Sequence, residues 1–287
     1  MHLLFGPNKP GFLKMPLFAN SFAALCKVPV LRKLLWKGWY QFLAGIDSKR
    51  PWTFMNYGYE SLDKPLAIVL EPGDEADRYS IQLYHELVGM TPLADKDVLE
   101  VGSGRGGGAS YIQRYFKPGK TVGVDYSEKA IAFCSRIHQV QGLTFRQGDA
   151  EALPFPDETF DVVLNVESSH CYGSLEAFFS EVRRILRPGG FFLHTDFRGN
   201  DQVEIWLKLL KNSNLEMIQQ REITPNVLAA LDADNQRKMQ LIQETVPKVL
   251  VKSFLDFAGV KGSTVYEYFR TREMQYLQFV LRKAKPS

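Results

Sequence analysis

The chain has 287 residues, 45% hydrophobic and 23% charged, which is typical of a soluble globular protein and long enough for one large α/β domain with a cap. Its three cysteines are odd in number and far apart, which argues against a disulfide framework and favours a cytoplasmic, reducing environment. No Cys or His spacing matches a metal site, and a net charge of +3 does not indicate nucleic-acid binding, so we expect neither partner.

Basic residues gather at the N-terminus. Residues 1–50 hold eight Lys or Arg and one acid, Asp47, so the remainder holds 27 basic and 31 acidic residues. Apolar residues recur at helical spacing over 30–43, which predicts a basic amphipathic helix ahead of a domain spanning 51–287. In the simpler interpretation this helix packs over the core edge. In the alternative, residues 1–45 contact a membrane surface as an interfacial helix, since no apolar run is long enough to span one.

From residue 75 onward, helical and extended patterns alternate. Helices are predicted at 75–89, 107–116, 127–139 and 174–186, and strands at 97–102, 121–125, 143–147, 160–166 and 190–195. Ser127 is placed to cap the third of these helices. Strands separated by helices of this length form βαβ units and therefore a parallel sheet. Beyond residue 200, helical patterns cover 201–212 and 225–258 before a returning strand at 275–282.

The first predicted strand ends in a glycine-dense turn, with glycines at 102, 104, 106, 107 and 108. Glycine tolerates a positive φ and lets a ligand approach the backbone, while the following helix start attracts polar or anionic groups. Asp125 stands 19 residues after Gly106, at the end of the next strand, where an acid can hydrogen bond a ribose. This spacing predicts an adenosine-containing cofactor, although Gly102-x-Gly104-x-x-Gly107 also fits a dinucleotide.

Later segments favour a cofactor other than a dinucleotide. Asp149 follows the third strand, at the sheet edge where ligands bind, and its carboxylate can accept from an adenine amino group beside the N–H of Ala150. A further buried strand, 160–166, ends in polar residues, and Leu186-Arg187-Pro188-Gly189-Gly190 precedes the fifth strand. These segments argue against a nicotinamide oxidoreductase.

The chain resembles the class I S-adenosylmethionine-dependent methyltransferases. The resemblance rests on VLEVGSGRG, VGVDYS, GDAEALPF, FDVVLNVESSH and LRPGG, in this order across about residues 97–196. SIQLYH at 80–85, GGGASY, the run DAEALPFPDETFDVVLNVESSHCY and a strand ending in Asp196-Phe197-Arg198 are most similar to the mycobacterial phthiotriolone and phenolphthiotriolone dimycocerosate methyltransferases. Those enzymes O-methylate a hydroxyl of a long polyketide lipid.

The resemblance implies an α/β fold with a doubly wound, mostly parallel, seven-stranded sheet, N-terminal helices and a C-terminal helical lid. It divides the domain into a nucleotide-binding core at 90–200, a helical substrate region at 201–272 and a final strand at 273–285. It also implies that S-adenosyl-L-methionine is held by ten residues. These are Tyr59, Gly102, Ser103, Gly104, Gly106, Asp125, Tyr126, Asp149, Ala150 and Asn165.

Methyl transfer to an oxygen needs little chemistry beyond alignment and removal of the acceptor proton. His170 lies just beyond the fourth strand, where the methyl would point, and is the candidate base. Asp196, at the end of the fifth strand, could orient His170 or act as a second base, and Glu167 is a third candidate. For each residue the alternative is a purely structural role in its loop or strand.

The acceptor is expected to be hydrophobic, because the helical region before the last strand is rich in Val, Leu, Phe and Tyr. We therefore predict O-methylation of a hydroxyl on a lipid, polyketide or related natural product. The alternative is C-methylation of an isoprenoid, sterol or quinol, for which acidic and aromatic residues would matter more than His170. A catalytically silent cofactor-binding module is a weaker interpretation.

Overall fold

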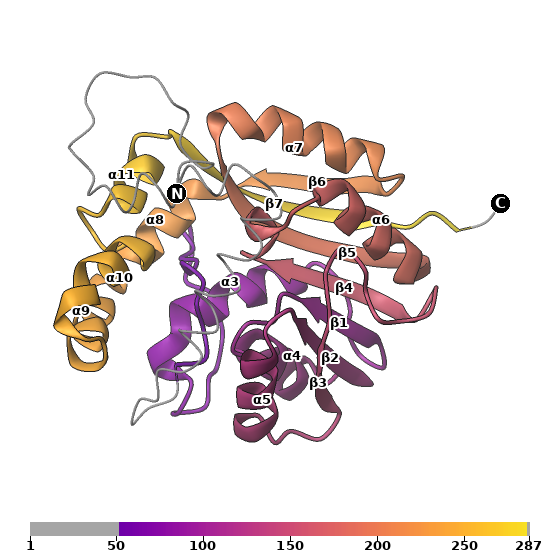
Figure 1. The fold of residues 1–287 in the computed structure, drawn as a ribbon, viewed down its shortest axis with the longest axis horizontal. Coiled ribbons are helices and arrows are strands. Elements are labelled where there is room, and N and C mark those ends of the chain that lie inside the picture. Colours follow the sequence, from indigo (N-terminus) through magenta and orange to yellow (C-terminus); the bar gives the residue numbers. More distant parts are fainter. Residues whose placement is uncertain (1–51, 286–287) are drawn as a thin grey trace.

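The structure, a computed structural model, describes residues 52–285 (Figure 1). The basic segment 1–50, its predicted helix at 30–43 and the predicted membrane contact through 1–45 lie outside the described residues. Within 52–285, no helix is long and apolar enough to cross a membrane.

A seven-stranded sheet forms the centre of the molecule. Its strands are β1 (Asp97–Val101), β2 (Lys120–Asp125), β3 (Leu143–Gln147), β4 (Phe160–Val166), β5 (Leu186–Gly199), β6 (Glu216–Glu222) and β7 (Met274–Arg282). The spatial order is β3-β2-β1-β4-β5-β7-β6, with the first five strands parallel and β7 antiparallel to both neighbours. The predicted α/β fold with a doubly wound, mostly parallel sheet is confirmed.

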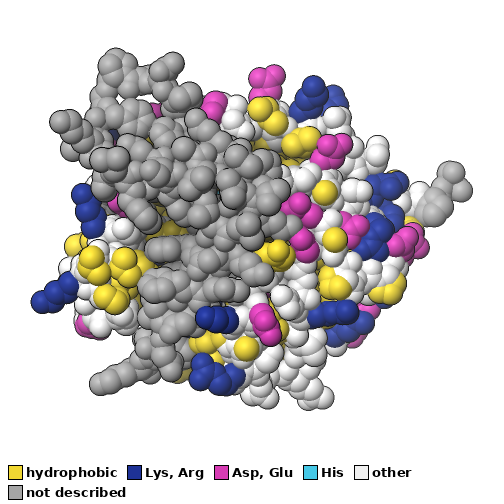
Figure 2. Space-filling model, viewed as in Figure 1, with side chains coloured by type: hydrophobic (Ala, Val, Ile, Leu, Met, Phe, Trp, Pro, Cys, Tyr) yellow, Lys and Arg dark blue, Asp and Glu magenta, His cyan; other side chains and the backbone are white. Residues whose placement is uncertain are grey.

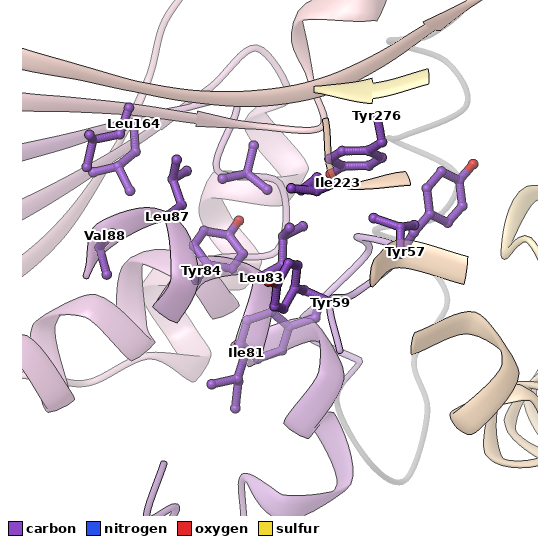
Figure 3. Close-up of a cluster of buried hydrophobic side chains, with 14 of the residues drawn as sticks. Tyr57, Tyr59, Ile81, Leu83, Tyr84, Leu87, Val88, Leu164, Ile223 and Tyr276 are labelled. Atoms are coloured by element: carbon purple, nitrogen blue, oxygen red, sulfur yellow. The ribbon is translucent and has the colours of Figure 1, made fainter. Parts of the chain in front are cut away.

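Helices cover both faces of the sheet because successive strand residues point to opposite sides. Val98 of β1 belongs to a cluster with α3 (Arg78–Val88) and α4 (Gly107–Phe116), whereas the adjacent Leu99 packs with α6 (Leu175–Ile185) and α7 (Asn200–Asn212). Figure 3 shows part of the first cluster, in which Leu83, Tyr84 and Leu87 of α3 lie beneath the sheet. The fold therefore has three layers, with α5 (Glu128–Ile137) against β2 and β3.

Local sequence explains where the central helices begin. The Ser127 side chain accepts from the Ala130 amide at 3.3 Å and starts α5, as predicted. Ser174 caps α6 in the same way. The predicted strand at 190–195 is longer at both ends, because Leu186 already pairs with Phe160 of β4 and β5 continues to pair with β7 as far as Gly199 and Met274.

The region predicted as helical at 201–272 is only partly so. Helix α7 packs on the sheet and β6 extends it, so the helical lid proper comprises residues 224–270. The sequence pattern missed β6 because nearly all of its side chains are exposed and it pairs only with β7, which leaves no apolar alternation.

The helical pattern predicted over 225–258 is confirmed, but it forms several elements. The chain forms α8 (Thr224–Ala233), α9 (Asn235–Thr245), a short 3₁₀ turn (Lys248–Leu250) and α10 (Val251–Phe257), followed by α11 (Thr264–Arg270). Pro247 forces Val246 into an extended conformation (φ −100°, ψ 134°), which ends α9. Helices α9 and α10 lie at the end of the molecule away from the sheet (Figure 1).

The two outer lid helices have a small core of their own. Ile242, Val246 and Phe254 are buried together, and Trp52 and Met55 pack against them from the start of the described chain. The segment 52–57, called the strap below, therefore lies against α9 and α10 on one side.

Candidate active site

The glycine turn after β1 forms the floor of the candidate site. Gly102 and Gly104 adopt positive φ values of 76° and 53°, which favour glycine. A Cβ at Gly102 would lie 2.3 Å from the Ser168 hydroxyl oxygen, and one at Gly104 would lie 2.7 Å from a Met55 methyl carbon. The turn is therefore compatible only with residues lacking a side chain at these two positions, and both line the pocket with Ser103.

Asp125, at the end of β2, faces the glycine turn. Its carboxylate accepts from the amides of Gly104 and Ser127 at 2.9 and 2.8 Å. Burial raises the pKa of Asp125 to about 6, although these amide bonds favour the charged form. Asp125 and the neighbouring Tyr126 both line the pocket.

Asp149 and Ala150 occupy the corresponding place after β3. One Asp149 carboxylate oxygen accepts from the Glu151 amide at 3.0 Å, and all three residues line the pocket. The carboxyl ends of β1, β2 and β3 therefore contribute to one cavity, as expected for adjacent parallel strands.

The strap forms the opposite wall. The Thr53 carbonyl accepts from the Gly107 amide at 3.2 Å, and the Tyr57 amide donates to Glu167 Oε1 at 2.7 Å. Lys238 of α9 donates to the Tyr57 carbonyl at 3.3 Å. The strap is thus attached to the sheet on one side and to the lid on the other.

The pocket between sheet and strap has about 1340 Å³ of space unfilled by atoms, including some open to solvent. Its acidic lining residues are Asp125, Asp149, Glu151 and Glu167, and its apolar ones include Phe54, Met55, Phe197 and Phe257. The guanidinium of Arg105, also a lining residue, bonds the Trp52 carbonyl and stacks over the Phe133 ring. The acidic side chains suit a cationic ligand, and the apolar side chains suit a hydrophobic ligand beside it.

His170 and Asp196 form a close pair at the rim of this pocket. His170 Nδ1 lies 2.8 Å from Asp196 Oδ1, and the His170 amide donates to Oδ2 at 3.0 Å. The imidazole packs against the Phe197 ring, with centroids 4.6 Å apart. His170 lines the pocket, whereas Asp196 is fully buried behind it.

Asp196 is held by further donors. Ser169 donates its hydroxyl to Oδ2 at 2.6 Å, and the Arg198 guanidinium lies 3.2 Å from the same oxygen. Burial would raise the pKa of Asp196, but the charges of Arg198 and His170 hold it well below its usual range. For His170, in contrast, burial would lower the pKa, but the neighbouring Cys171 and Asp196 side chains outweigh burial and raise it.

Glu167 has a different environment. It adopts a positive φ of 45°, and its Oε1 accepts from the Tyr57 amide and the Tyr276 hydroxyl, each at 2.7 Å. Burial raises the pKa of Glu167 to about 7. Its carboxylate is therefore used to anchor the strap, while it also lines the pocket.

Three predicted cofactor residues lie outside the pocket lining. Gly106 precedes the first residue of α4 with a φ of 78°, and Tyr59 is buried in the core beyond the strap. Asn165 is fully buried, and its amide donates to the Val101 carbonyl and the Ser168 and Tyr172 hydroxyls. These contacts hold the loop after β4 against the end of β1.

The resemblance implied that an aromatic segment at Gly58-Tyr59 closes over the cofactor, but other residues of this segment line the pocket. Phe54, Met55 and Tyr57 line the cavity, together with Phe257 of α10. The run of aromatic residues at 52–59 was the available signal, but it could not tell Tyr57 from Tyr59. Figure 3 shows Tyr57 at the end of the buried cluster, away from Tyr84 and Leu87.

Among residues 52–285, no group of three or more His, Cys, Asp and Glu side chains could hold a metal ion. The polar side chains that line the described pocket include carboxylates, the His170 imidazole, the Cys171 thiol, the Arg105 guanidinium and several serine and tyrosine hydroxyls.

Comparison with known proteins identifies the family. Residues 99–194 match the family model described as a methyltransferase domain. The chain is 38% identical over 251 residues to the phthiotriol/phenolphthiotriol dimycocerosates methyltransferase of Mycobacterium tuberculosis, covering 88% of this chain and 93% of that protein. It is 42% identical over 231 residues to the fatty-acid O-methyltransferase of Mycolicibacterium smegmatis, covering 80% and 83%.

Solved structures share the fold at low sequence identity. The geranyl diphosphate C-methyltransferase of Streptomyces coelicolor aligns with a TM-score of 0.61 at 17% identity, covering 87% of this chain and 98% of that one. The [4+2]-cyclase SpnF aligns with the same score and identity, covering 90% and 96%. With relatives near 40% identity along most of its length, the chain belongs to the S-adenosylmethionine-dependent methyltransferases.

Proposed function

We propose that this enzyme transfers a methyl group to an oxygen of a hydrophobic, lipid-like acceptor. The observation that carries the proposal is the His170–Asp196 pair. Its imidazole lines the same cavity as the glycine turn and Asp125. A base and a nucleotide-binding floor in one pocket are the two parts that O-methylation needs.

The residues on the floor fit S-adenosylmethionine. The glycine turn leaves space that a Cβ would fill, the acidic lining complements a positive charge, and two carboxylates stand at the ends of β2 and β3. In this proposal Gly102, Ser103 and Gly104 hold the methionine part. Asp125 accepts from the ribose hydroxyls, and Asp149 with Ala150 binds the adenine edge beside Tyr126.

Gly106 and Asn165 would act indirectly in this proposal, by shaping the turn and holding the loop after β4. Tyr59 is assigned no contact with the cofactor in this proposal, because it lies outside the pocket lining.

When bound, S-adenosylmethionine supplies a methyl group already activated on a sulfonium sulfur. The protein's task is then to position the acceptor oxygen and take its proton. Because His170 Nδ1 faces Asp196, Nε2 is the nitrogen that would receive the proton. Asp196 would stabilise the imidazolium that forms, and Glu167 would keep the strap closed over the reacting atoms.

The acceptor is proposed to be apolar because Phe197 packs against His170 and Phe54, Met55 and Phe257 line the same cavity. The relatives agree with this class: one is named for phthiotriol and phenolphthiotriol dimycocerosates and another for fatty acids. A hydroxyl acceptor makes use of the base, so we favour it.

A fatty-acid carboxyl is the second candidate acceptor. The raised pKa of His170 favours an imidazolium, which would attract a carboxylate, and the relative at 42% identity is named a fatty-acid O-methyltransferase. C-methylation receives less support. The C-methyltransferases among the structural neighbours are below 25% identity and share the fold alone.

The test is to incubate the enzyme with isotopically labelled S-adenosylmethionine and a lipid extract, then analyse the labelled products by mass spectrometry. Mild alkaline hydrolysis separates the candidates. A labelled methyl ether survives it and supports a hydroxyl acceptor, whereas a labelled methyl ester is cleaved and supports a carboxyl acceptor. A label on carbon alone, or none in any lipid, would contradict the proposal.

A further inference from the structure

The turn between α9 and α10, residues 247–252, presents an apolar side chain to solvent. Val249 is 86% exposed, one of few large hydrophobic side chains outside the core among the described residues. Figure 2 shows hydrophobic side chains exposed over the end of the molecule where α9 and α10 lie, with Lys and Arg side chains beside them. A single exposed valine is common on protein surfaces, so its meaning depends on the charges that surround it.

Two lysines flank the exposed valine. Lys248 and Lys252 are both exposed, and neither forms an ion pair within the described part of the chain. An acid lies four residues from each lysine, Glu244 before Lys248 and Asp256 after Lys252, and each already accepts a hydrogen bond, from Gln240 at 2.7 Å and from the Thr264 amide at 3.1 Å. An apolar tip between two cations that form no ion pair with residues 52–285 matches the boundary of an anionic bilayer, where lipid phosphates lie just above the acyl chains.

The turn is also connected to the pocket. Leu250 and Val251 pack against the small lid core around Phe254, and Phe257 of the same helix lines the active-site cavity. The lid core therefore connects the exposed turn to Phe257, which lines the pocket.

We propose that the α9–α10 turn docks on an anionic lipid surface, with Val249 inserted below the headgroups and Lys248 and Lys252 bound to lipid phosphates. This inference rests on the proposed function for its purpose, because a membrane-resident acceptor would then enter along α10. It is independent of the N-terminal segment, because it uses only residues of the lid.

The test places a fluorescent reporter at the turn of the full-length enzyme. Val249→Trp is mixed with vesicles of phosphatidylcholine and phosphatidylglycerol whose acyl chains are brominated. Insertion predicts a blue-shifted tryptophan emission and quenching beyond that of the wild-type protein. Val69→Trp is the matched control, because Val69 is 89% exposed but has no flanking lysines, and it should show neither change.

A second measurement tests the charges. The double substitution Lys248→Glu and Lys252→Glu should lower partition onto the anionic vesicles by roughly tenfold or more, since each lysine contributes about 1 kcal/mol at such a surface. Phosphatidylcholine vesicles alone should bind the wild type weakly. If Val249→Trp is no more quenched than wild type, the turn does not insert and the proposal is wrong.

The two proposals fail separately. Insertion of the turn into vesicles can be measured without an acceptor and without methyl transfer. Calorimetry with S-adenosylhomocysteine measures binding to the cofactor pocket in the absence of lipid. A protein that binds S-adenosylhomocysteine but leaves Val249→Trp unquenched would refute only the docking surface. A quenched turn without any labelled lipid product would refute only the proposed reaction.

Discussion

One carboxylate holds both the side chain and the backbone of His170. Asp196 Oδ1 lies 2.8 Å from His170 Nδ1, while Oδ2 accepts from the amide of the same residue at 3.0 Å. The imidazole is therefore fixed in orientation by a group that is itself buried in β5. Such fixation is what a proton acceptor needs if its second nitrogen is to meet an acceptor oxygen.

Replacing the imidazole should slow catalysis without weakening cofactor binding. We expect His170→Ala to lower turnover by roughly a hundredfold or more, the usual contribution of a positioned base, with an unchanged Kd for S-adenosylhomocysteine. Steady-state kinetics and calorimetry measure the two quantities. His85→Gln is the matched control, because His85 contacts Tyr111 outside the pocket. Wild-type turnover in His170→Ala would remove His170 from the mechanism.

The pH dependence of kcat/KM should report the titration of His170 beside Asp196. His170 accepts a proton only when neutral, and its pKa is raised, so kcat/KM should increase with pH beyond the range of an ordinary histidine. Asp196→Asn removes the negative charge that favours the imidazolium, so the pKa falls and the acidic limb moves to lower pH. The plateau should also fall, since a neutral amide stabilises the imidazolium poorly. An acidic limb at the same pH in both enzymes would show that another group titrates.

Asp125 should govern cofactor affinity. Asp125→Ala removes the proposed ribose acceptor and the bonds to the Gly104 and Ser127 amides, each a charge-assisted hydrogen bond. Calorimetry should show S-adenosylhomocysteine binding weakened by about tenfold to a hundredfold. Tyr59→Phe should bind normally, because Tyr59 lies outside the lining. Unchanged affinity in Asp125→Ala would rule out its role.

Glu100 should make the protein less stable as the pH rises. Its carboxyl is fully buried, accepts from the Tyr84 hydroxyl at 2.6 Å, and has one oxygen without a partner. Burial raises the pKa of Glu100 from 4.5 to about 8, so the folded state binds a proton that the unfolded state has lost between these values. Stability then falls by up to roughly 1.4 kcal/mol per pH unit in that window.

The amide in Glu100→Gln cannot ionise, so this variant should not lose stability between the two pKa values as the wild type does. Urea unfolding of both proteins from about pH 5 to about pH 9, which spans the window set by the two pKa values, is the measurement. Glu128→Gln, at the exposed first residue of α5, controls for the loss of one charge. Parallel stability curves for wild type and Glu100→Gln would contradict the assignment.

The sequence was informative wherever short-range rules decide the structure. The glycine turn, Asp125 and Asp149 could be brought together in advance, because parallel strands present their carboxyl ends at one edge. The proximity of His170 and Asp196 follows from the same rule, since β4 and β5 are neighbours.

The features of the site that the sequence did not predict depend on contacts between residues far apart in the chain. Gly58, with a φ of 91°, turns the chain between Tyr57 and Tyr59, so the ordinary alternation of side chains fails and only Tyr57 reaches the pocket. Asn165 was expected beneath the cofactor through its backbone, which stays a prediction, but the sequence did not predict that its buried side-chain amide donates to a carbonyl and two hydroxyls. Such choices depend on partners far along the chain, which no local pattern contains.

Strand β5 has a consequence for which parts of the pocket can vary. The last residue of β5 that pairs with β4 is Thr195. Asp196, the next residue, still pairs with Leu277 of β7. The helices at 224–270 are inserted between β6 and β7 without interrupting that pairing. The proposed base and its carboxylate partner therefore lie at the carboxyl ends of sheet strands, whereas Phe257 of α10 reaches the pocket from the inserted helices, so substitutions in α10 can change the pocket wall without altering the pair.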